Sequence, residues 1–201
     1  MPKQFQPLGG RALLEWSVDL LRDAGCTPLY LVVPEDLIRD TKRGFETSEC
    51  RIIAGGERRQ DSVFNALQEV EAATVVVHDA ARPLATIAMV RDVVGALSKW
   101  DGAIVAVPAD ETLKVVDGER VTRTVDRSTI WQAQTPQGFR TEVLREAHRR
   151  AREEGFHATD DASLVEQAGG SVAVVLGDRT NLKITRPEDF DLAQAILESR
   201  S

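Results

Sequence analysis

The sequence predicts an α/β fold: a Rossmann-like, mostly parallel sheet with helices on both faces and a projecting β-hairpin arm. Short apolar runs of strand length alternate with segments of helical periodicity, as in parallel sheets covered on both sides. At about 109–128 a hairpin pattern interrupts this alternation and is expected to project from the sheet. With 201 residues the chain has room for one sizeable core, so residues 1–201 should form a single domain.

Five short runs carry the strand signal. Four of them are rich in β-branched residues, as expected of strands that are buried on both faces. They lie at 29–33, 74–77, 103–107 and 172–176. A fifth run, at 51–53, precedes a pair of glycines.

Helical periodicity fills the intervals between these runs. Helices are expected over 14–21, 64–70, 90–97 and 142–154, and from 186 onward. Gly25 and Gly155 stand where the first and the fourth of these helices should end. Pro187 suits the first turn of the last helix, where Glu188 and Asp189 lie near the positive end of the helix dipole.

The hairpin arm is predicted by two alternating runs, 112–116 and 120–125, joined by Asp117-Gly118. An Asp-Gly pair between alternating runs is the strongest short-range hairpin signal, because the turn requires positive φ.

Composition and charge exclude several classes of function. The net charge of −7 disfavours non-specific binding to nucleic acid, and an anionic substrate would need a local cluster of Arg and Lys. No apolar run approaches the ~20 residues that a membrane span needs, and no secretory signal pattern opens the chain. Cys26 and Cys50 lie far apart without metal-ligand spacing, which indicates free thiols and a cytoplasmic protein.

The first candidate site is the segment 78–83 (His-Asp-Ala-Ala-Arg-Pro), directly after the run 74–77. In open α/β sheets, ligands bind beyond the carboxyl ends of the strands. Asp79 is a candidate Mg²⁺ ligand there, and Arg82 a candidate bidentate partner of a phosphate group. In the alternative interpretation, Asp79 pairs with Arg82 and merely orders the loop.

A second candidate site is the glycine-containing segment 55–62 (Gly-Gly-Glu-Arg-Arg-Gln-Asp-Ser). Backbone amides of a Gly-Gly turn at the start of a helix can receive an anion or a base edge. Alternatively, Asp61 or Ser62 simply caps the helix. The dinucleotide-binding and P-loop glycine motifs are absent from the sequence.

Three further polar segments, 124–127, 134–137 and 159–163, are expected at strand ends. Each also has a purely structural interpretation: 124–127 as a solvated hairpin strand, 134–137 as a plain turn, and 159–163 as an N-capped helix start. Lys183 alternates with Leu182 and Ile184, so it should face opposite them, and it could be a solubilising charge on an edge strand.

Taken together, these segments resemble a known family. In chain order they are 2–5, 55–56, 59–63, 78–83, 124–127, 134–137, 159–163 and 181–187. Their order and spacing resemble the 2-C-methyl-D-erythritol 4-phosphate cytidylyltransferases, essentially from end to end. Ribitol-5-phosphate cytidylyltransferases are the nearest rival, but the Ala-Ala of 78–83, the Thr-Val-Asp-Arg run and the Thr-Asp-Asp-Ala-Ser run fit the erythritol-phosphate enzymes better.

The resemblance implies a Mg²⁺-dependent transfer of CMP from CTP to a polyol phosphate, and a role for each of ten residues. For CTP, it implies that Lys3 neutralises the triphosphate, that the cytosine is read by Gly56 and Ser62, and that Asp79 holds Mg²⁺ and the ribose region. For the acceptor, it implies that the methylerythritol phosphate is surrounded by Arg82, Thr112, Thr135 and Thr159 and is positioned by Arg127 and Lys183. It also implies a homodimer whose arms cross, so that Arg127 completes the partner's site.

The sequence departs from the family pattern at its start. Family members place a strand and a glycine-rich loop with an arginine just before the Pro-Lys-Gln, whereas here the sequence opens with Met1-Pro2-Lys3. We therefore expect a site without its triphosphate loop and a sheet with exposed apolar neighbours at its middle. Two alternatives to the function that the resemblance implies stay open. One is the same chemistry on another polyol phosphate such as ribitol 5-phosphate, and the other is a non-catalytic protein that binds nucleotide or dimerises.

Overall fold

A computed structural model describes residues 3–200, apart from the side chain of Lys3. The strands are β1 Pro7–Leu8, β2 Arg11–Ala12, β3 Leu29–Val33, β4 Cys50–Ala54, β5 Thr74–Val77, β6 Gly102–Pro108, β7 Lys114–Asp117, β8 Arg120–Thr124, β9 Trp131–Arg140 and β10 Val172–Leu176. The α-helices are α1 Leu13–Asp23, α2 Ile38–Phe45, α3 Arg59–Leu67, α4 Ile87–Ala96, α5 Thr141–Glu154, α6 Asp161–Gln167 and α7 Pro187–Arg200. Short 3₁₀ turns lie at Lys3–Phe5, Glu35–Leu37 and Arg127–Thr129.

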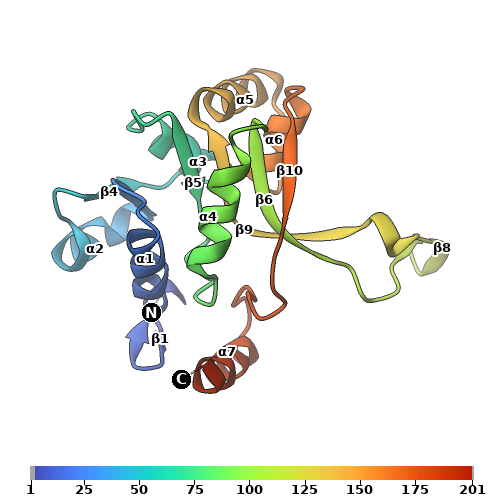
Figure 1. Cartoon of the computed structure of the whole chain (residues 1–201), viewed down its shortest axis with the longest axis horizontal. Coiled ribbons are helices and arrows are strands. Elements are labelled where there is room, and N and C mark those ends of the chain that lie inside the picture. The colour runs from blue at the N-terminus through green and yellow to red at the C-terminus, as the bar shows by residue number, and fades with distance from the viewer. Residues whose placement is uncertain (1–2, 201) are drawn as a thin grey trace.

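The central sheet has the strand order β10-β6-β9-β5, and β3 and β4 form a separate parallel pair. β10 runs parallel to β6, whereas β9 runs antiparallel to both β6 and β5. β5, β6 and β10 therefore share one direction, and β9 alone opposes them. This confirms the predicted α/β fold (Figure 1), with a sheet that is mixed because β9 is antiparallel to both of its neighbours.

Helices cover the sheet on both faces, as expected for strands with apolar side chains on both sides. On one face, Val93 of α4 and Leu20 of α1 belong to the cluster that contains Val105 of β6. On the other face, Phe139 of β9 packs with residues of α3, α5 and α6, among them Leu144. α7 covers β1 at the end of the molecule where both termini lie (Figure 1).

Local sequence rules account for most element boundaries. β3, β5 and β10 begin and end where their uninterrupted apolar runs do. α1 and α5 end next to Gly25 and Gly155, which have φ of 87° and 65°, values that residues with a Cβ rarely adopt. α3 ends at Leu67, earlier than predicted, although Val70 beyond it is buried as the apolar spacing required.

β9 corrects one prediction. The segment 134–137 lies in the middle of this ten-residue strand rather than at a strand end or in a turn. A shift of register places Gln137 opposite Ile104 but Ala133 opposite Ala106, so residues 134–136 together face a single position of β6. Such a bulge accommodates Pro136, which has no N–H to donate to a regular ladder.

The predicted hairpin arm is present. β7 and β8 pair antiparallel around Gly118, whose φ is 57°, and the ribbon projects away from the sheet and its helices (Figure 1). Val116 and Val121 on this ribbon are more than half exposed. Among residues 3–200, no helix combines the length and the apolar character that crossing a membrane requires.

Candidate active site

Asp79 lies at the carboxyl end of β5, between two cations. Its Oδ2 lies 2.7 Å from Nζ of Lys183, and its Oδ1 accepts a hydrogen bond from Nε of Arg59 at 3.2 Å. Burial by itself raises the pKa of Asp79, but the hydrogen bond from Lys183 and the charge of Arg59 outweigh it, so that the pKa lies below its ordinary value. The structure thus brings together Asp79 and Lys183, two of the predicted site residues, and adds Arg59, which had no assigned role.

Arg59 is held from its other side by a buried carboxylate. Its Nη1 lies 2.7 Å from Oδ2 of Asp161, which is 1% exposed, and Oδ1 of Asp161 lies 3.1 Å from Nε2 of His148 in the core. Burial by itself lowers the pKa of Arg59, but the charges of Asp161 and Asp79 outweigh it, so that the pKa lies above its ordinary value. These contacts form one continuous series of polar side chains, which we call the Asp79 cluster: Lys183, Asp79, Arg59, Asp161 and His148.

The loop around Asp79 is fixed by a second set of hydrogen bonds. The backbone N–H of Asp79 donates to Oγ1 of Thr135 at 3.0 Å, and that oxygen lies 3.0 Å from Nδ1 of His78. Nε2 of His78 lies 3.2 Å from the carbonyl oxygen of Arg82. All of these contacts can form at once when His78 is neutral with its proton on Nε2. Burial lowers the pKa of His78 to about 4, which favours this neutral form. Thr135, a predicted substrate ligand, therefore holds the backbone of Asp79.

Arg82 does not pair with Asp79, so the interpretation of 78–83 as a loop ordered by that ion pair is wrong. Nη1 of Arg82 donates to the carbonyl of Asn181 at 2.6 Å, and Nη2 donates to the carbonyl of Ala133 at 3.4 Å. Burial lowers the pKa of its guanidinium. Arg82 thus links the Asp79 loop to the segment that carries Lys183.

A cavity of about 370 Å³ lies beside Arg82. Its lining comprises Arg82, Val107, Pro108, Asp110, Gln132, Ala133, Gln134, Arg179, Asn181, Leu182 and Lys183. Three of these side chains are cationic and one, Asp110, is a carboxylate that pairs with Arg179. The excess of positive charge favours an anionic substrate in a protein of net charge −7.

Gly56 and Ser62 contact each other in the glycine turn. The N–H of Gly56 donates to Oγ of Ser62 at 3.1 Å. A Cβ on Gly56 would lie 2.4 Å from the Cβ of Asp61, so this turn accepts only glycine. Asp61 and Ser62 lie inside α3, whose N-cap is Arg58, and the expectation that one of them caps the helix is wrong.

β9 contacts the remaining site loops through two glutamines. Nε2 of Gln137 donates to Oδ2 of Asp160 at 2.9 Å, and Oε1 of Gln134 accepts from Nδ2 of Asn181 at 3.0 Å. Asp160 also caps α6 by accepting from the N–H of Ser163, so the alternative interpretation of 159–163 as an N-capped helix start is confirmed.

Three predicted site residues lie away from the Asp79 cluster, and the side chain of a fourth lies outside the described part of the protein. Thr112 and Arg127 lie on the hairpin arm, where the guanidinium of Arg127 donates to the backbone oxygen of Asp110. Thr159 is exposed in the loop before Asp160. The side chain of Lys3 lies outside the part of the chain that the structure describes. Lys183 faces away from buried Ile184, as its alternation predicted, but lies in an extended loop rather than in a strand.

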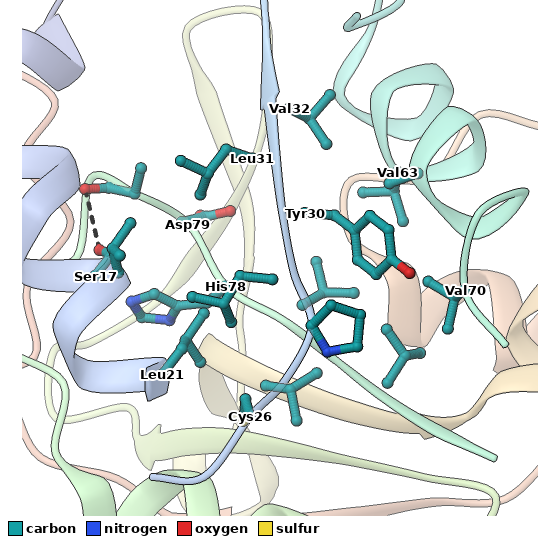
Figure 2. A pocket seen from close by; sticks show the side chains of 18 of the residues that line it. Ser17, Leu21, Cys26, Tyr30, Leu31, Val32, Val63, Val70, His78 and Asp79 are labelled. Carbon is teal, nitrogen blue, oxygen red and sulfur yellow. Dashed lines mark hydrogen bonds between the residues drawn. The ribbon is translucent and has the colours of Figure 1, made fainter. Parts of the chain in front are cut away.

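A second and larger cavity, of about 1060 Å³, extends from the Asp79 cluster between β3 and β5. In Figure 2, His78, Asp79 and Leu31 lie to the left of the ribbon of β3, and Tyr30 and Val32 lie to its right. Most of the side chains that line it are apolar.

The carboxylate of Asp79 fits a cation of the Mg²⁺ type. Within residues 3–200, no group of three or more His, Cys, Asp and Glu side chains gathers into a metal cage. Mg²⁺ does not need such a cage, because it is usually held by one or two carboxylates together with substrate phosphates and water. Asp79, 16% exposed at the end of β5, would supply one such ligand if the metal replaced its contact with Lys183 or Arg59.

Comparison with known proteins agrees with this geometry. The sequence model of the family "IspD: 2-C-methyl-D-erythritol 4-phosphate cytidylyltransferase" matches residues 1–199. A 2-C-methyl-D-erythritol 4-phosphate cytidylyltransferase from Aquifex aeolicus is 46% identical over 195 residues, which cover 97% of this chain and 89% of that protein. One from Syntrophotalea carbinolica is 42% identical over 98% of this chain and 88% of its own length.

Solved structures give the same result. The crystal structure of 2-C-methyl-D-erythritol 4-phosphate cytidylyltransferase from Thermus thermophilus superposes with a TM-score of 0.85 at 38% identity and covers 98% of this chain and 94% of that one. The 4-diphosphocytidyl-2C-methyl-D-erythritol synthase of Anaerococcus prevotii superposes with a TM-score of 0.88 at 28% identity, over 97% and 93% of the two chains. This chain therefore belongs to the 2-C-methyl-D-erythritol 4-phosphate cytidylyltransferase family.

Proposed function

We propose that this chain transfers CMP from CTP to 2-C-methyl-D-erythritol 4-phosphate and releases pyrophosphate, with Mg²⁺ as its cofactor, in the cytoplasm. One observation carries the proposal. The carboxylate of Asp79 and the cations Lys183 and Arg59 meet at the carboxyl end of β5, next to the cationic cavity of Arg82. The likeness to enzymes of that name over nearly the whole chain supports the choice of substrates.

The proposed reaction makes few chemical demands on the protein. An oxygen of the acceptor phosphate forms a bond to the α-phosphorus of CTP. The bond from that phosphorus to the oxygen that bridges it to the β-phosphorus breaks, and this oxygen leaves with pyrophosphate. The attacking phosphate is already an anion, so no side chain has to remove a proton. Catalysis then consists of positioning the two substrates and stabilising the charge that develops. This agrees with a site built from Lys, Arg and one carboxylate.

The metal would be held by Asp79, and when bound it would neutralise phosphate charge. Lys183 lies within hydrogen-bond distance of this carboxylate, and we assign it to the acceptor phosphate. We assign Arg82 and Thr159 to the surroundings of the methylerythritol phosphate, Gly56 and Ser62 to the cytosine, and Lys3 to the triphosphate. For Thr135, the contacts with Asp79 and His78 support a positioning role within the acceptor site.

We further propose a homodimer in which each arm reaches the partner's site. Thr112 and Arg127 lie on the arm, which projects from its own domain (Figure 1). A two-stranded ribbon is at best marginally stable alone, and exposed Val116 and Val121 would be covered by a partner. In this arrangement Arg127 would contact the acceptor phosphate bound to the other subunit.

Product identity tests the proposed function. The chain is incubated with CTP and either 2-C-methyl-D-erythritol 4-phosphate or ribitol 5-phosphate, and ³¹P NMR follows the phosphorus signals. We expect the pair of resonances of a cytidine diphosphate ester, together with pyrophosphate, only with the methylerythritol substrate, CTP and Mg²⁺ present. Product from ribitol 5-phosphate alone would assign a different acceptor. Binding of CTP without any product would indicate a nucleotide-binding protein and contradict the proposal.

A further inference from the structure

Arg179 lines the cavity beside Arg82 and pairs there with a carboxylate. Its guanidinium contacts the carboxylate of Asp110, which lines the same cavity. The two residues come from different segments, because Asp110 follows β6 at the base of the hairpin arm and Arg179 follows β10. The side chains of Arg179 and Asp110 are 61% and 46% exposed. An ion pair between two groups as exposed as these is weak, so an incoming ligand can break it.

The backbone around Arg179 is fixed, although its side chain is exposed. Oδ1 of Asp178 accepts from the N–H and from the hydroxyl of Thr180, at 2.7 and 2.6 Å. The carbonyl of Asp178 accepts from Nε2 of Gln134 at 2.9 Å and from the N–H of Asn181 at 3.0 Å. The residues on both sides of Arg179 are therefore held in place. A side chain on such a loop binds a ligand without the cost of ordering the backbone.

The other two cations of the cavity are held more firmly than Arg179. Both terminal nitrogens of Arg82 donate to backbone carbonyls of the cavity wall. Nζ of Lys183 lies 2.7 Å from the carboxylate of Asp79, which is much less exposed than that of Asp110. An anion that enters the cavity can therefore recruit Arg179 more easily than either of the other cations.

We propose that Arg179 is a further acceptor-binding residue, which exchanges the carboxylate of Asp110 for the phosphate of the acceptor. The inference rests on the proposed function, because it takes the cavity as the site of a phosphate monoester. Both groups offer the guanidinium a pair of oxygen acceptors. At pH 7, however, a phosphate monoester carries about 1.5–2 negative charges, whereas a carboxylate carries one. Asp110 thus occupies the place of the anion in the free protein and favours doubly charged acceptors over singly charged ones.

The exchange also changes how the base of the hairpin arm is held. The guanidinium of Arg127 donates to the backbone oxygen of Asp110, and the N–H of Ala109 donates to the carbonyl of Ile130 at 2.9 Å. These two contacts join the two ends of the arm to each other, whereas the ion pair with Arg179 joins the arm to the loop after β10. Binding of the acceptor phosphate therefore releases the arm from that loop.

Calorimetric titration with inorganic phosphate at pH 7.5 tests the proposal without CTP and without turnover. Asp110→Asn removes the competing charge and should tighten phosphate binding by about 2–5-fold, as expected for loss of a weak, exposed ion pair. Arg179→Gln should weaken binding by about 5–10-fold, because a charged hydrogen-bond donor is lost. In the protein with both substitutions, the gain from Asp110→Asn should disappear, because the two residues act on the same phosphate.

A matched ion pair on α2 controls for the change in net charge. Asp40 and Arg43 are both exposed, contact each other at 3.8 Å, and do not line the cavity. Asp40→Asn and Arg43→Gln change the charge of the protein by the same amounts as the test substitutions. Both control substitutions should leave the phosphate affinity unchanged, and circular dichroism should show that all variants are folded.

Two further measurements separate binding from the arm. With 2-C-methyl-D-erythritol 4-phosphate as the acceptor, Arg179→Gln should raise KM and leave kcat unchanged, because the lost contact exists before the reaction as well as during it. Hydrogen exchange of the Ala109 amide reports how the arm is held. Saturating phosphate should speed this exchange in the unsubstituted chain. In Asp110→Asn the exchange should already be fast, and phosphate should not change it.

Two results would overturn the proposal. Equal phosphate affinity in the unsubstituted chain, Asp110→Asn and Arg179→Gln would show that the anion binds without Arg179. Weaker binding in Asp110→Asn would show that the carboxylate does not compete with the anion. The outcome is also distinguishable from failure of the proposed function. A chain that binds phosphate as expected but forms no product would contradict the transfer reaction, whereas a chain that forms product with unaltered phosphate affinity in both variants would contradict the role of Arg179 alone.

Discussion

The ammonium group of Lys183 lies 2.7 Å from Oδ2 of Asp79, while Nε of Arg59 contacts the other oxygen of that carboxylate at 3.2 Å. One carboxylate therefore shares its charge between two cations that come from different loops. The pair with Lys183 joins the end of β5 to the segment before α7, and the pair with Arg59 joins it to the start of α3. Substitutions in this group should affect both stability and ligand binding, which makes paired measurements informative.

Asp161→Asn should destabilise the protein, because Asp161 is a nearly fully buried ion-pair partner of Arg59. The amide keeps the shape but loses the charge, and we expect the free energy of unfolding in urea to fall by about 1.5–3 kcal/mol. Glu142→Gln is the control. Glu142 also pairs with an arginine, but its side chain is 83% exposed, so the change should stay within about 0.5 kcal/mol. Equal effects of the two substitutions would contradict the buried role of Asp161.

Asp79→Asn should weaken binding of the divalent metal. Loss of outer-shell partners already costs about 10–100-fold in metal affinity, and loss of a direct ligand should cost at least as much. Mn²⁺, followed by electron paramagnetic resonance with CTP present, reports binding without turnover, and EDTA should reverse the signal. Glu142→Gln again serves as the control. Unchanged Mn²⁺ affinity in Asp79→Asn would remove Asp79 from the proposed metal site.

Asp101 should make stability depend on pH in the acid range. Its carboxylate accepts hydrogen bonds from the backbone N–H and the hydroxyl of Ser171, which lower its pKa, the backbone bond contributing most. Because the folded-state pKa lies below the unfolded one, this contribution is complete above the unfolded pKa of about 3.9. It is lost as the pH falls through the folded pKa.

Thermal unfolding as a function of pH measures this contribution. Between about pH 5 and 2, the melting temperature of Asp101→Asn should fall less steeply than that of the unsubstituted chain. Asp92→Asn, a change at an exposed position on α4, should leave the slope unchanged. Parallel curves for all three proteins would show that the Asp101–Ser171 contact does not contribute.

Mixing of two inactive variants tests the shared site. In Arg127→Ala and Lys183→Ala, each homodimer carries one defect per site. If Arg127 acts across the interface, a mixed dimer holds one site with both defects and one site with neither, and product should form again. If Arg127 acts within its own subunit, every site keeps one defect. Subunit exchange confirmed by native mass spectrometry without recovery of product would reject the crossed-arm dimer.

Much of the fold could be predicted because its strands follow simple rules. β3, β5 and β10 are uninterrupted apolar runs, and Asp117-Gly118 marks the arm. β9 could not be predicted, because its buried residues other than Phe139 are Gln, Thr, Pro and Gly. Its neighbours on both sides, rather than its own propensity, hold it extended. α2 was missed because its apolar stripe is short: Ile38 and Phe45 are its only large apolar residues, and they pack on the core while only partly buried.

The site was predictable where single segments carried it. Asp79 and Lys183 were identified separately, and the structure places them in contact. The ion pair of Arg59 with Asp161 was missed because the two residues are far apart in the sequence, and nothing in either segment indicates that the two segments meet. One signal was available: both residues lie in the first turn of a helix, within segments that the sequence had already marked as candidate site segments.

The bulged strand β9 has a consequence for the motions of the protein. Thr135 contacts the Asp79 loop, Gln137 contacts Asp160 at the start of α6, and Gln134 contacts Asn181 before Lys183. Three loops that carry the site are therefore attached to four consecutive residues of one buried strand. Their thermal fluctuations should be correlated, because a displacement of β9 moves all three loops in the same direction. Loops of this site would then shift as a unit on ligand binding, and relaxation measurements should find one common exchange rate for them.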